Sequence, residues 1–202
     1  MNKSALMLLL VILFTSFSTE RIGYKPGDVA ADFKLKNIDD QLVSLADMKT
    51  AKGFILIFIC NHCPCVAKYE ERILALDKKY KALGYPVVAI NSLDILRYPQ
   101  ESLARMKARA KFKNYSFPYL SDEEQTVVKE FGAPSTPFVY VLQKVSKQLV
   151  VRYTGGIDDC MERESAVKEK YVENAITDLL AGKKVTKDNS KTIGCAIAYR
   201  NK

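Results

Sequence analysis

The sequence predicts an α/β fold, with a central and at least partly parallel sheet flanked by helices. Apolar runs of strand length alternate along the chain with segments of helical spacing, a pattern typical of α/β proteins. Residues 53–59, GFILIFI, are apolar without interruption, as expected of a strand buried on both faces in the middle of a sheet. A chain of 202 residues, 48% hydrophobic and 27% charged, fits one folded domain with some additions.

The individual elements follow from local composition. Strands are assigned to apolar runs bounded by turn residues, and helices to runs whose apolar residues recur every three or four positions. In chain order, the expected elements are strands at 32–35, 41–45 and 53–59, a helix from Val66 that Gly84 ends, a strand at 85–90, helices at 102–112 and 124–131, paired strands at 138–142 and 149–153, and a helix at 164–180. A polar stretch at 183–191 leads into the tail.

Residues 1–18 have the pattern of a secretory signal peptide. Lys3 supplies the positive start, residues 5–14 the apolar stretch, and residues 16–18 a small-x-small cleavage site. The apolar run is about half of the roughly 20 residues that a spanning helix needs, so we expect no stable membrane insertion after cleavage. The sequence thus predicts an exported protein, periplasmic or extracellular, with residues 19–202 as a single domain that ends in a helix and a tail.

The net charge of +8 does not by itself predict a nucleic-acid partner, because 31 Lys and Arg are interleaved with 23 Asp and Glu. The densest basic run, residues 105–113, has a basic residue at every second position. On a helix this spacing sends successive charges to opposite faces. We therefore expect a solvated face and no nucleic-acid binding.

The chemically reactive residue types gather in one segment, Cys60-Asn61-His62-Cys63-Pro64-Cys65, between the buried strand and the first long helix. Two cysteines separated by two residues at a helix start can close a small disulfide, and the free N–H groups and helix dipole there stabilise a thiolate. Pro64 suits a first turn because the N–H that it lacks would have no intrahelical partner. The motif predicts thiol-disulfide exchange. Cys60 is expected to attack, because the helix start and solvent can both reach it, and His62 is expected to tune the pair.

A zinc site is the alternative interpretation of a CxxC motif. Such a site needs about four ligands. His62 is the only histidine in the chain, and no second CxxC follows. We therefore expect neither a metal nor another cofactor.

Several stretches resemble the thioredoxin-like superfamily, in a peroxiredoxin-like branch that carries CxxC. Residues 27–35 are similar to the opening of alkyl hydroperoxide reductase and thiol-specific antioxidant proteins. Similarity to the CxxC-bearing branch is found in residues 58–64, 117–123, 132–137 and 193–195. This resemblance implies a thioredoxin fold, with a central mixed sheet flanked by helices and an N-terminal strand extension.

The resemblance also implies residue roles. It makes Cys60 the nucleophile and Cys63 the resolving thiol of a redox-active Cys60–Cys63 disulfide. Pro137 is the implied cis-proline, and Thr136 is expected to pair with an extended substrate peptide. Two features depart from the relatives. Ile57 stands where peroxiredoxins have a threonine three residues before the reactive cysteine, and the buried strand lacks the acid that thioredoxins place behind the resolving cysteine.

Three cysteines remain to be interpreted. Cys65, in the first turn of the helix, is expected to be a small packing residue. Cys160 and Cys195 either form a structural disulfide or stay apart, because the sequence does not determine their distance.

Three classes of function follow from these observations. The leading one is an exported thiol-disulfide oxidoreductase that acts on protein thiols or disulfides together with an unidentified redox partner. The second is a thiol peroxidase of the peroxiredoxin type, with antioxidant activity. The third is a thioredoxin-fold copper-binding assembly factor, because soft thiolates suit Cu(I), although no second histidine is present to complete such a site.

Overall fold

The structure, a computed structural model, describes residues 23–200. The signal peptide expected at residues 1–18 lies outside the described residues, so it stays a prediction, as does the start of the domain at residue 19. Within residues 23–200, no helix combines the length and the apolar character needed to cross a membrane.

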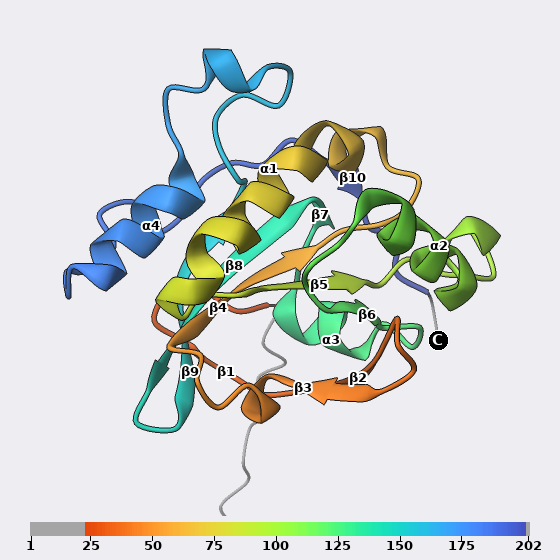
Figure 1. Cartoon of the computed structure of the whole chain (residues 1–202), viewed down its shortest axis with the longest axis horizontal. Helices are drawn as coiled ribbons and strands as arrows, with labels where there is room; N and C mark the ends of the chain where they lie inside the picture. Colours follow the sequence, from red (N-terminus) through yellow and green to blue (C-terminus); the bar gives the residue numbers. More distant parts are fainter. Residues whose placement is uncertain (1–22, 201–202) are drawn as a thin grey trace, which may run out of the picture.

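A mixed sheet of eight strands forms the centre of the described chain, in the order β1-β9-β8-β4-β5-β6-β2-β3 (Figure 1). The central strand β4 is parallel to β5 and antiparallel to β8, and β5 is parallel to β6. The strands are β1 Val29–Ala30, β2 Lys34–Asn37, β3 Leu42–Ser44, β4 Gly53–Phe58, β5 Val87–Asn91, β6 Tyr119–Ser121, β8 Phe138–Val145 and β9 Gln148–Gly155. The expected mixed sheet is confirmed, and N-terminal strands extend it at both edges.

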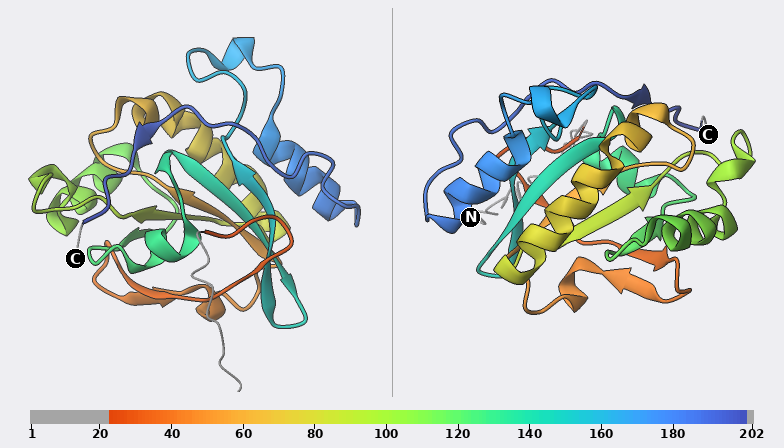
Figure 2. Two further views of the ribbon diagram at one scale, coloured as in Figure 1. Left: turned by 180° about the vertical axis from the view of Figure 1, so that it is seen from behind. Right: turned by 45° about the horizontal axis from the view of Figure 1, so that its top comes forward.

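Within the described residues, four α-helices cover the sheet: α1 Pro64–Tyr80, α2 Leu103–Lys113, α3 Thr126–Phe131 and α4 Tyr171–Leu180. Helices α1, α2 and α4 lie on one face, and the view from behind shows α3 on the other (Figures 1 and 2). On the α3 face, the ring of Phe131 packs against those of Phe58 and Tyr140, with centroids 5.9 and 5.1 Å apart. Helices on both faces therefore shield β4 from water.

All six residues of strand β4 are buried, as are those of the neighbouring strands β5 and β6. Its hydrogen-bonding edges are both occupied, by β5 on one side and β8 on the other. The uninterrupted apolar run in the sequence reflects this position. Since the strand cannot shift between its neighbours, it fixes where the following cysteine-rich loop emerges.

Some elements differ from the sequence prediction. The helix expected from residue 164 begins only at Tyr171, and Glu164–Ala166 form a separate 3₁₀ turn. Strand β6 was not predicted, because three residues after a proline give too short a pattern. Two further strands of two residues each, β7 Ser135–Thr136 and β10 Cys195–Ala196, pair with one another outside the main sheet. Such short strands owe their existence to tertiary pairing and leave no periodicity in the sequence.

The basic run at 105–113 is not a uniformly solvated face. Glu70 on α1 is buried, and its carboxylate pairs with Arg109 at 2.8 Å and with Lys113 at 2.7 Å. The hydroxyl of Tyr115 also donates to Glu70, at 2.6 Å. Two of the five basic residues therefore attach α2 to α1, and the expectation of a solvated face was wrong for them.

Gly53 provides a test of how tightly β4 is enclosed. A Cβ at this position would lie 2.1 Å from the carbonyl oxygen of Leu142 and 2.5 Å from the Tyr85 ring. We expect Gly53→Ala to lower the free energy of unfolding by about 3 kcal/mol, at the upper end of overpacking effects, because a paired backbone must move. Urea denaturation measures this loss.

Gly156→Ala is the control, because its added Cβ would come no closer than 3.1 Å, to the Lys191 carbonyl in a loop. We expect this change to cost clearly less than Gly53→Ala. Equal losses would show that β4 is less confined than the structure indicates.

Candidate active site

The cysteine-rich segment connects β4 to α1, as the sequence predicts. Strand β4 ends at Phe58, and α1 begins at Pro64 with Cys63 as its N-cap residue. The start of the helix is therefore at Cys63 and not at Cys60. The stabilising field of the helix N-terminus acts most strongly on the second cysteine of the motif.

A buried carboxylate holds the loop between the two cysteines. Glu101, 1% exposed, accepts hydrogen bonds from the backbone N–H groups of Asn61 at 2.7 Å and His62 at 3.1 Å. It also accepts from the side-chain amide of Asn91, at 2.7 Å. Asn61 is further anchored by Arg109, which donates to its carbonyl oxygen at 2.7 Å. Sequence reasoning missed Glu101, since no motif links it to residues forty positions earlier.

The imidazole of His62 faces this same carboxylate. Its Nδ1 pairs with Glu101, and its ring stacks on Tyr98 with centroids 5.1 Å apart. The hydrogen-bond partner of the His62 ring is thus Glu101 and not the Cys60 sulfur. A ring nitrogen of His62, a carboxylate oxygen of Glu101 and the Cys60 sulfur all lie within 4.8 Å of one another, so His62 can act on Cys60 both through space and through Glu101.

Cys60 is a free thiol with no exposed surface. Burial raises its pKa to about 11; the Glu101 carboxylate also raises it, while a hydrogen bond with Thr136 and one with the Cys63 backbone lower it. The Cys60 sulfur lies 3.3 Å from the Thr136 hydroxyl. In the described state Cys60 is thus protonated and shielded, contrary to the expectation of a solvent-reached thiolate.

The disulfide of the structure joins Cys63 to Cys195, with their Cα atoms 6.4 Å apart. In the described state this bond takes the place of the predicted Cys60–Cys63 disulfide, and of the two alternatives left open for Cys160 and Cys195 the structure has them apart. Cys195 reaches Cys63 because β10 pairs with β7 beside the start of α1, as Figure 1 shows. Cys160 stays free because its loop is held elsewhere, by Arg72 on α1, which donates to the Cys160 carbonyl at 2.7 Å.

The tail segment that carries Cys195 runs back across the molecule from α4 to the start of α1 (Figure 2). There Cys195 pairs antiparallel with Thr136, the residue before the cis peptide bond to Pro137. The Cys63 sulfur lies 3.4 Å from the Thr136 carbonyl oxygen. The structure thus brings Cys60, Cys63, Thr136 and Pro137 together, as predicted, and adds Cys195 from the far end of the chain.

Cys65 also belongs to this cluster. Its sulfur lies 3.8 Å from that of Cys195, and the sulfurs of Cys63, Cys65 and Cys195 are all within 4.8 Å of one another. The side chain of Cys65 is half-buried. The expectation that Cys65 is only a packing residue is incomplete, because it faces a disulfide.

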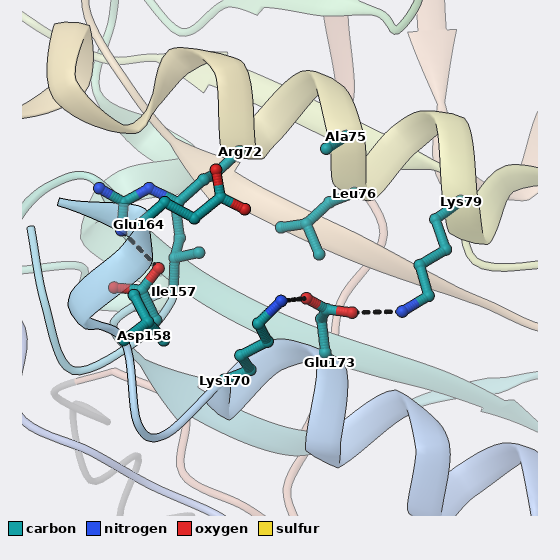
Figure 3. A pocket seen from close by; sticks show the side chains of 10 residues that line it. Arg72, Ala75, Leu76, Lys79, Ile157, Asp158, Glu164, Lys170 and Glu173 are labelled. Carbon is teal, nitrogen blue, oxygen red and sulfur yellow. Dashed lines mark hydrogen bonds and ion pairs between the residues drawn. The ribbon is translucent and has the colours of Figure 1, made fainter.

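A separate hollow of about 60 Å³ lies between α1, α4 and the loop before α4 (Figure 3). Most of its charged side chains are paired with one another: Arg72 with Asp158 at 2.6 Å, and Glu173 with Lys170 and Lys79. None of the cysteines lines it. The hollow therefore contributes no group to the thiol chemistry.

Comparison with known proteins agrees with this geometry. The model of the AhpC/TSA family matches residues 26–159. A solved, uncharacterized conserved protein from Geobacillus kaustophilus is 35% identical with a TM-score of 0.80, over 88% of this chain and 93% of that one. Solved thioredoxin-like proteins with TM-scores of 0.54 and 0.57 share the fold alone, at 20% and 23% identity. The thioredoxin fold implied by the resemblance is confirmed.

Two relatives carry the names of the first two expected classes of function, a thiol-disulfide oxidoreductase and a peroxiredoxin. The thiol-disulfide oxidoreductase ResA of Halalkalibacterium halodurans is 24% identical over 151 residues, which are 75% of this chain and 81% of that protein. The chloroplastic peroxiredoxin Q of Triticum aestivum is 32% identical over 125 residues, which are 58% of this chain and 54% of that protein.

The raised pKa of Cys60 predicts how the disulfide-bonded protein reacts with iodoacetamide. With a pKa of about 11, only about one Cys60 in a thousand is a thiolate at pH 8, so its alkylation should be slow. The rate should rise about tenfold per pH unit up to pH 9.5 without levelling off, whereas an ordinary thiol with a pKa of about 8.5 levels off in this range. Peptide mass spectrometry measures both rates, with Cys160 as the internal reference. A Cys60 rate that levels off below pH 9.5 would contradict the assignment.

The role of Glu101 can be tested at the same thiol. Glu101→Gln removes a negative charge that raises the pKa of Cys60, so alkylation of Cys60 at pH 8 should accelerate roughly threefold or more. Glu162→Gln is the matched control, because Glu162 is an exposed carboxylate paired with Lys68. An unchanged rate in Glu101→Gln, or an equal rise in both variants, would refute the electrostatic link.

Proposed function

Because the chain belongs to the AhpC/TSA family, we propose that it is an exported thiol-disulfide oxidoreductase that acts on protein thiols or disulfides through Cys60 and Cys63. The relationship to a named thiol-disulfide oxidoreductase, ResA, supports the reaction class. The signal-like pattern of residues 1–18 and the placement of all five cysteines after it support work outside the cytosol, where disulfides persist.

One observation carries the proposal: the Cys63 sulfur is bonded to a cysteine of an extended segment that pairs with β7 beside Pro137. A substrate peptide joined to the enzyme by a mixed disulfide needs the same three elements. These are an exchanging sulfur at a helix start, a strand edge for the peptide backbone, and a second thiol nearby. The tail occupies the position that we assign to a substrate.

The proposed roles of the two cysteines differ from the order expected from the motif. Cys63, at the N-terminus of α1, carries the mixed disulfide and is stabilised there as a thiolate when it is released. Cys60 is the shielded thiol that attacks Cys63. In that step the Cys60–Cys63 bond forms, the bond from Cys63 to the partner breaks, and the partner leaves as a thiolate.

The attack by Cys60 requires loss of its proton. A carboxylate oxygen of Glu101 lies within 4.8 Å of the Cys60 sulfur. We assign to Glu101 the proton-accepting function that the buried strand lacks, and to His62 the positioning of that carboxylate. Glu101 thus takes the part of the acid that thioredoxins place behind their cysteines, from a different segment of the chain.

Peroxide reduction is the second candidate function. The relationship to peroxiredoxin Q supports it. Ile57 stands where peroxiredoxins have a threonine, but the hydroxyl of Thr136, 3.3 Å from the Cys60 sulfur, supplies a hydroxyl group beside this thiol. The burial of Cys60 and its raised pKa oppose it, because peroxide chemistry needs an accessible thiolate.

Binding of Cu(I) by the reduced protein is favoured by the three clustered sulfurs of Cys63, Cys65 and Cys195. It requires the Cys63–Cys195 disulfide to be open. A competition titration with a chromogenic Cu(I) chelator, with and without prior reduction, distinguishes it from disulfide exchange.

The leading proposal predicts catalysis of insulin reduction by dithiothreitol. We expect Cys60→Ser and Cys63→Ser each to lower the catalysed rate roughly tenfold or more, because each removes a reacting sulfur. Cys160→Ser is the matched control and should retain the full rate, since Cys160 lies outside the sulfur cluster.

Hydrogen peroxide consumption by the reduced protein is measured alongside. Rapid peroxide turnover without insulin reduction would replace the leading proposal with the second one. Full activity in Cys63→Ser would disprove the assigned roles.

A further inference from the structure

Cys195 has two sulfur neighbours. It is bonded to Cys63, and the sulfur of Cys65 lies 3.8 Å from its own. Cys63 in turn has Cys60 within its own CxxC motif as an alternative partner. A single disulfide can therefore form between any of three neighbouring pairs of cysteines: Cys60–Cys63, Cys63–Cys195 and Cys65–Cys195.

The four cysteines differ in how well an external thiol can reach them. Cys60 is 0% exposed and Cys63 is 1% exposed, whereas Cys65 and Cys195 are half-buried. Exchange requires the attacking thiolate to reach a disulfide sulfur directly. In the described state, Cys65 and Cys195 present the sulfurs that a partner can contact, and the CxxC pair does not.

The tail is held in place by backbone contacts that do not depend on the disulfide. Strand β10 pairs with β7 in the register Cys195 to Thr136, and just after β10 the N–H group of Ile197 donates to the Pro134 carbonyl at 3.1 Å. Gly194 packs so closely that an added Cβ would lie 2.6 Å from the Thr136 carbonyl oxygen. Cys195 therefore stays beside the start of α1 when it changes its sulfur partner.

We propose that Cys65 and Cys195 extend the Cys60–Cys63 pair into a relay of four cysteines, which moves one disulfide between the buried pair and the surface. The inference rests on the proposed thiol-disulfide function and names the residues through which a protein thiol or disulfide partner exchanges. Cys65 and Cys195 are then catalytic residues, and the tail is the carrier between the two ends of the relay.

In the outward step, the Cys65 thiolate attacks the Cys195 sulfur. The Cys65–Cys195 bond forms, the Cys63–Cys195 bond breaks, and Cys63 leaves as a thiolate at the N-terminus of α1. In the inward step, the Cys60 thiolate attacks Cys63, the Cys60–Cys63 bond forms, and Cys195 leaves as a thiolate. Each step keeps one disulfide, so no oxidant or reductant is consumed. The proton of the attacking thiol is taken by solvent in the outward step and by Glu101 in the inward step, and the leaving thiolate takes up a proton in turn.

The relay is tested by disulfide mapping of the full chain, oxidised to one disulfide per molecule, then acid-quenched, alkylated and digested without reduction. We expect Cys63→Ser to link Cys65 to Cys195, because the tail holds the two sulfurs together. Serine is a good N-cap residue, so this variant should keep α1 intact. Cys195 recovered as a free thiol in folded Cys63→Ser would overturn the proposal.

The rate at which glutathione reduces the disulfide tests the route of exchange. We expect Cys65→Ser to slow reduction of the Cys63–Cys195 disulfide by glutathione about threefold or more, since the outward step to Cys65 is lost and glutathione has only the half-buried Cys195 sulfur of the tail-held bond to attack. Cys160→Ser is the matched control and should react at the unaltered rate. Reduction of Cys65→Ser at the unaltered rate would overturn the relay.

A third variant leaves every sulfur in place. Gly194→Ala disturbs the docking of β10 on Thr136, so the share of tail-linked disulfide should fall several-fold in favour of Cys60–Cys63. An unchanged distribution would show that the tail does not act as a positioned carrier.

If disulfides interconvert as described while the protein does not reduce insulin, the proposed function fails and the relay stands. If insulin is reduced and Cys65→Ser changes neither mapping nor kinetics, the relay alone fails.

Discussion

The confinement of β4 in the middle of the sheet is the constraint on which the rest of the site depends. Hydrogen bonds to β5 and β8 occupy both of its edges, and its six residues are all buried. The strand therefore delivers the CxxC loop to one fixed place, where α1 begins and where the Thr136–Pro137 segment passes. A looser strand would leave the sulfurs free to move, and exchange depends on sulfurs that are held within reach of one another.

The electrostatic surroundings of Cys60 and Cys63 differ, although the two cysteines are only three positions apart, and they favour different protonation states. Cys63 caps α1, where the helix N-terminus favours a thiolate. Cys60 is buried near Glu101, where burial and negative charge both favour the neutral thiol. Glu101 also holds the loop through the N–H groups of Asn61 and His62. One carboxylate thus couples the shape of the loop to the acidity of the first cysteine.

The tail gives this arrangement its unusual feature, a disulfide between residues separated by 132 positions in the chain. The pairing of β10 with β7 supplies backbone hydrogen bonds where we place a substrate peptide. The chain therefore carries an extended segment whose own cysteine is bonded to Cys63, the sulfur to which we assign the exchange. Release or transfer of that disulfide is then part of the same chemistry as exchange with another protein.

The sequence by itself determined the α/β class, the central strand, the CxxC loop at a helix start, and the family resemblance, because these depend on local composition and spacing. It could not determine which cysteines are bonded, since pairing depends on distances that only folding sets. It could not reveal Glu101, which reaches the loop from the 3₁₀ turn before α2, or the exposure of each sulfur. Tertiary structure decided these points because β10, a strand of two residues, exists only through its contact with β7 and brings Cys195 to Cys63.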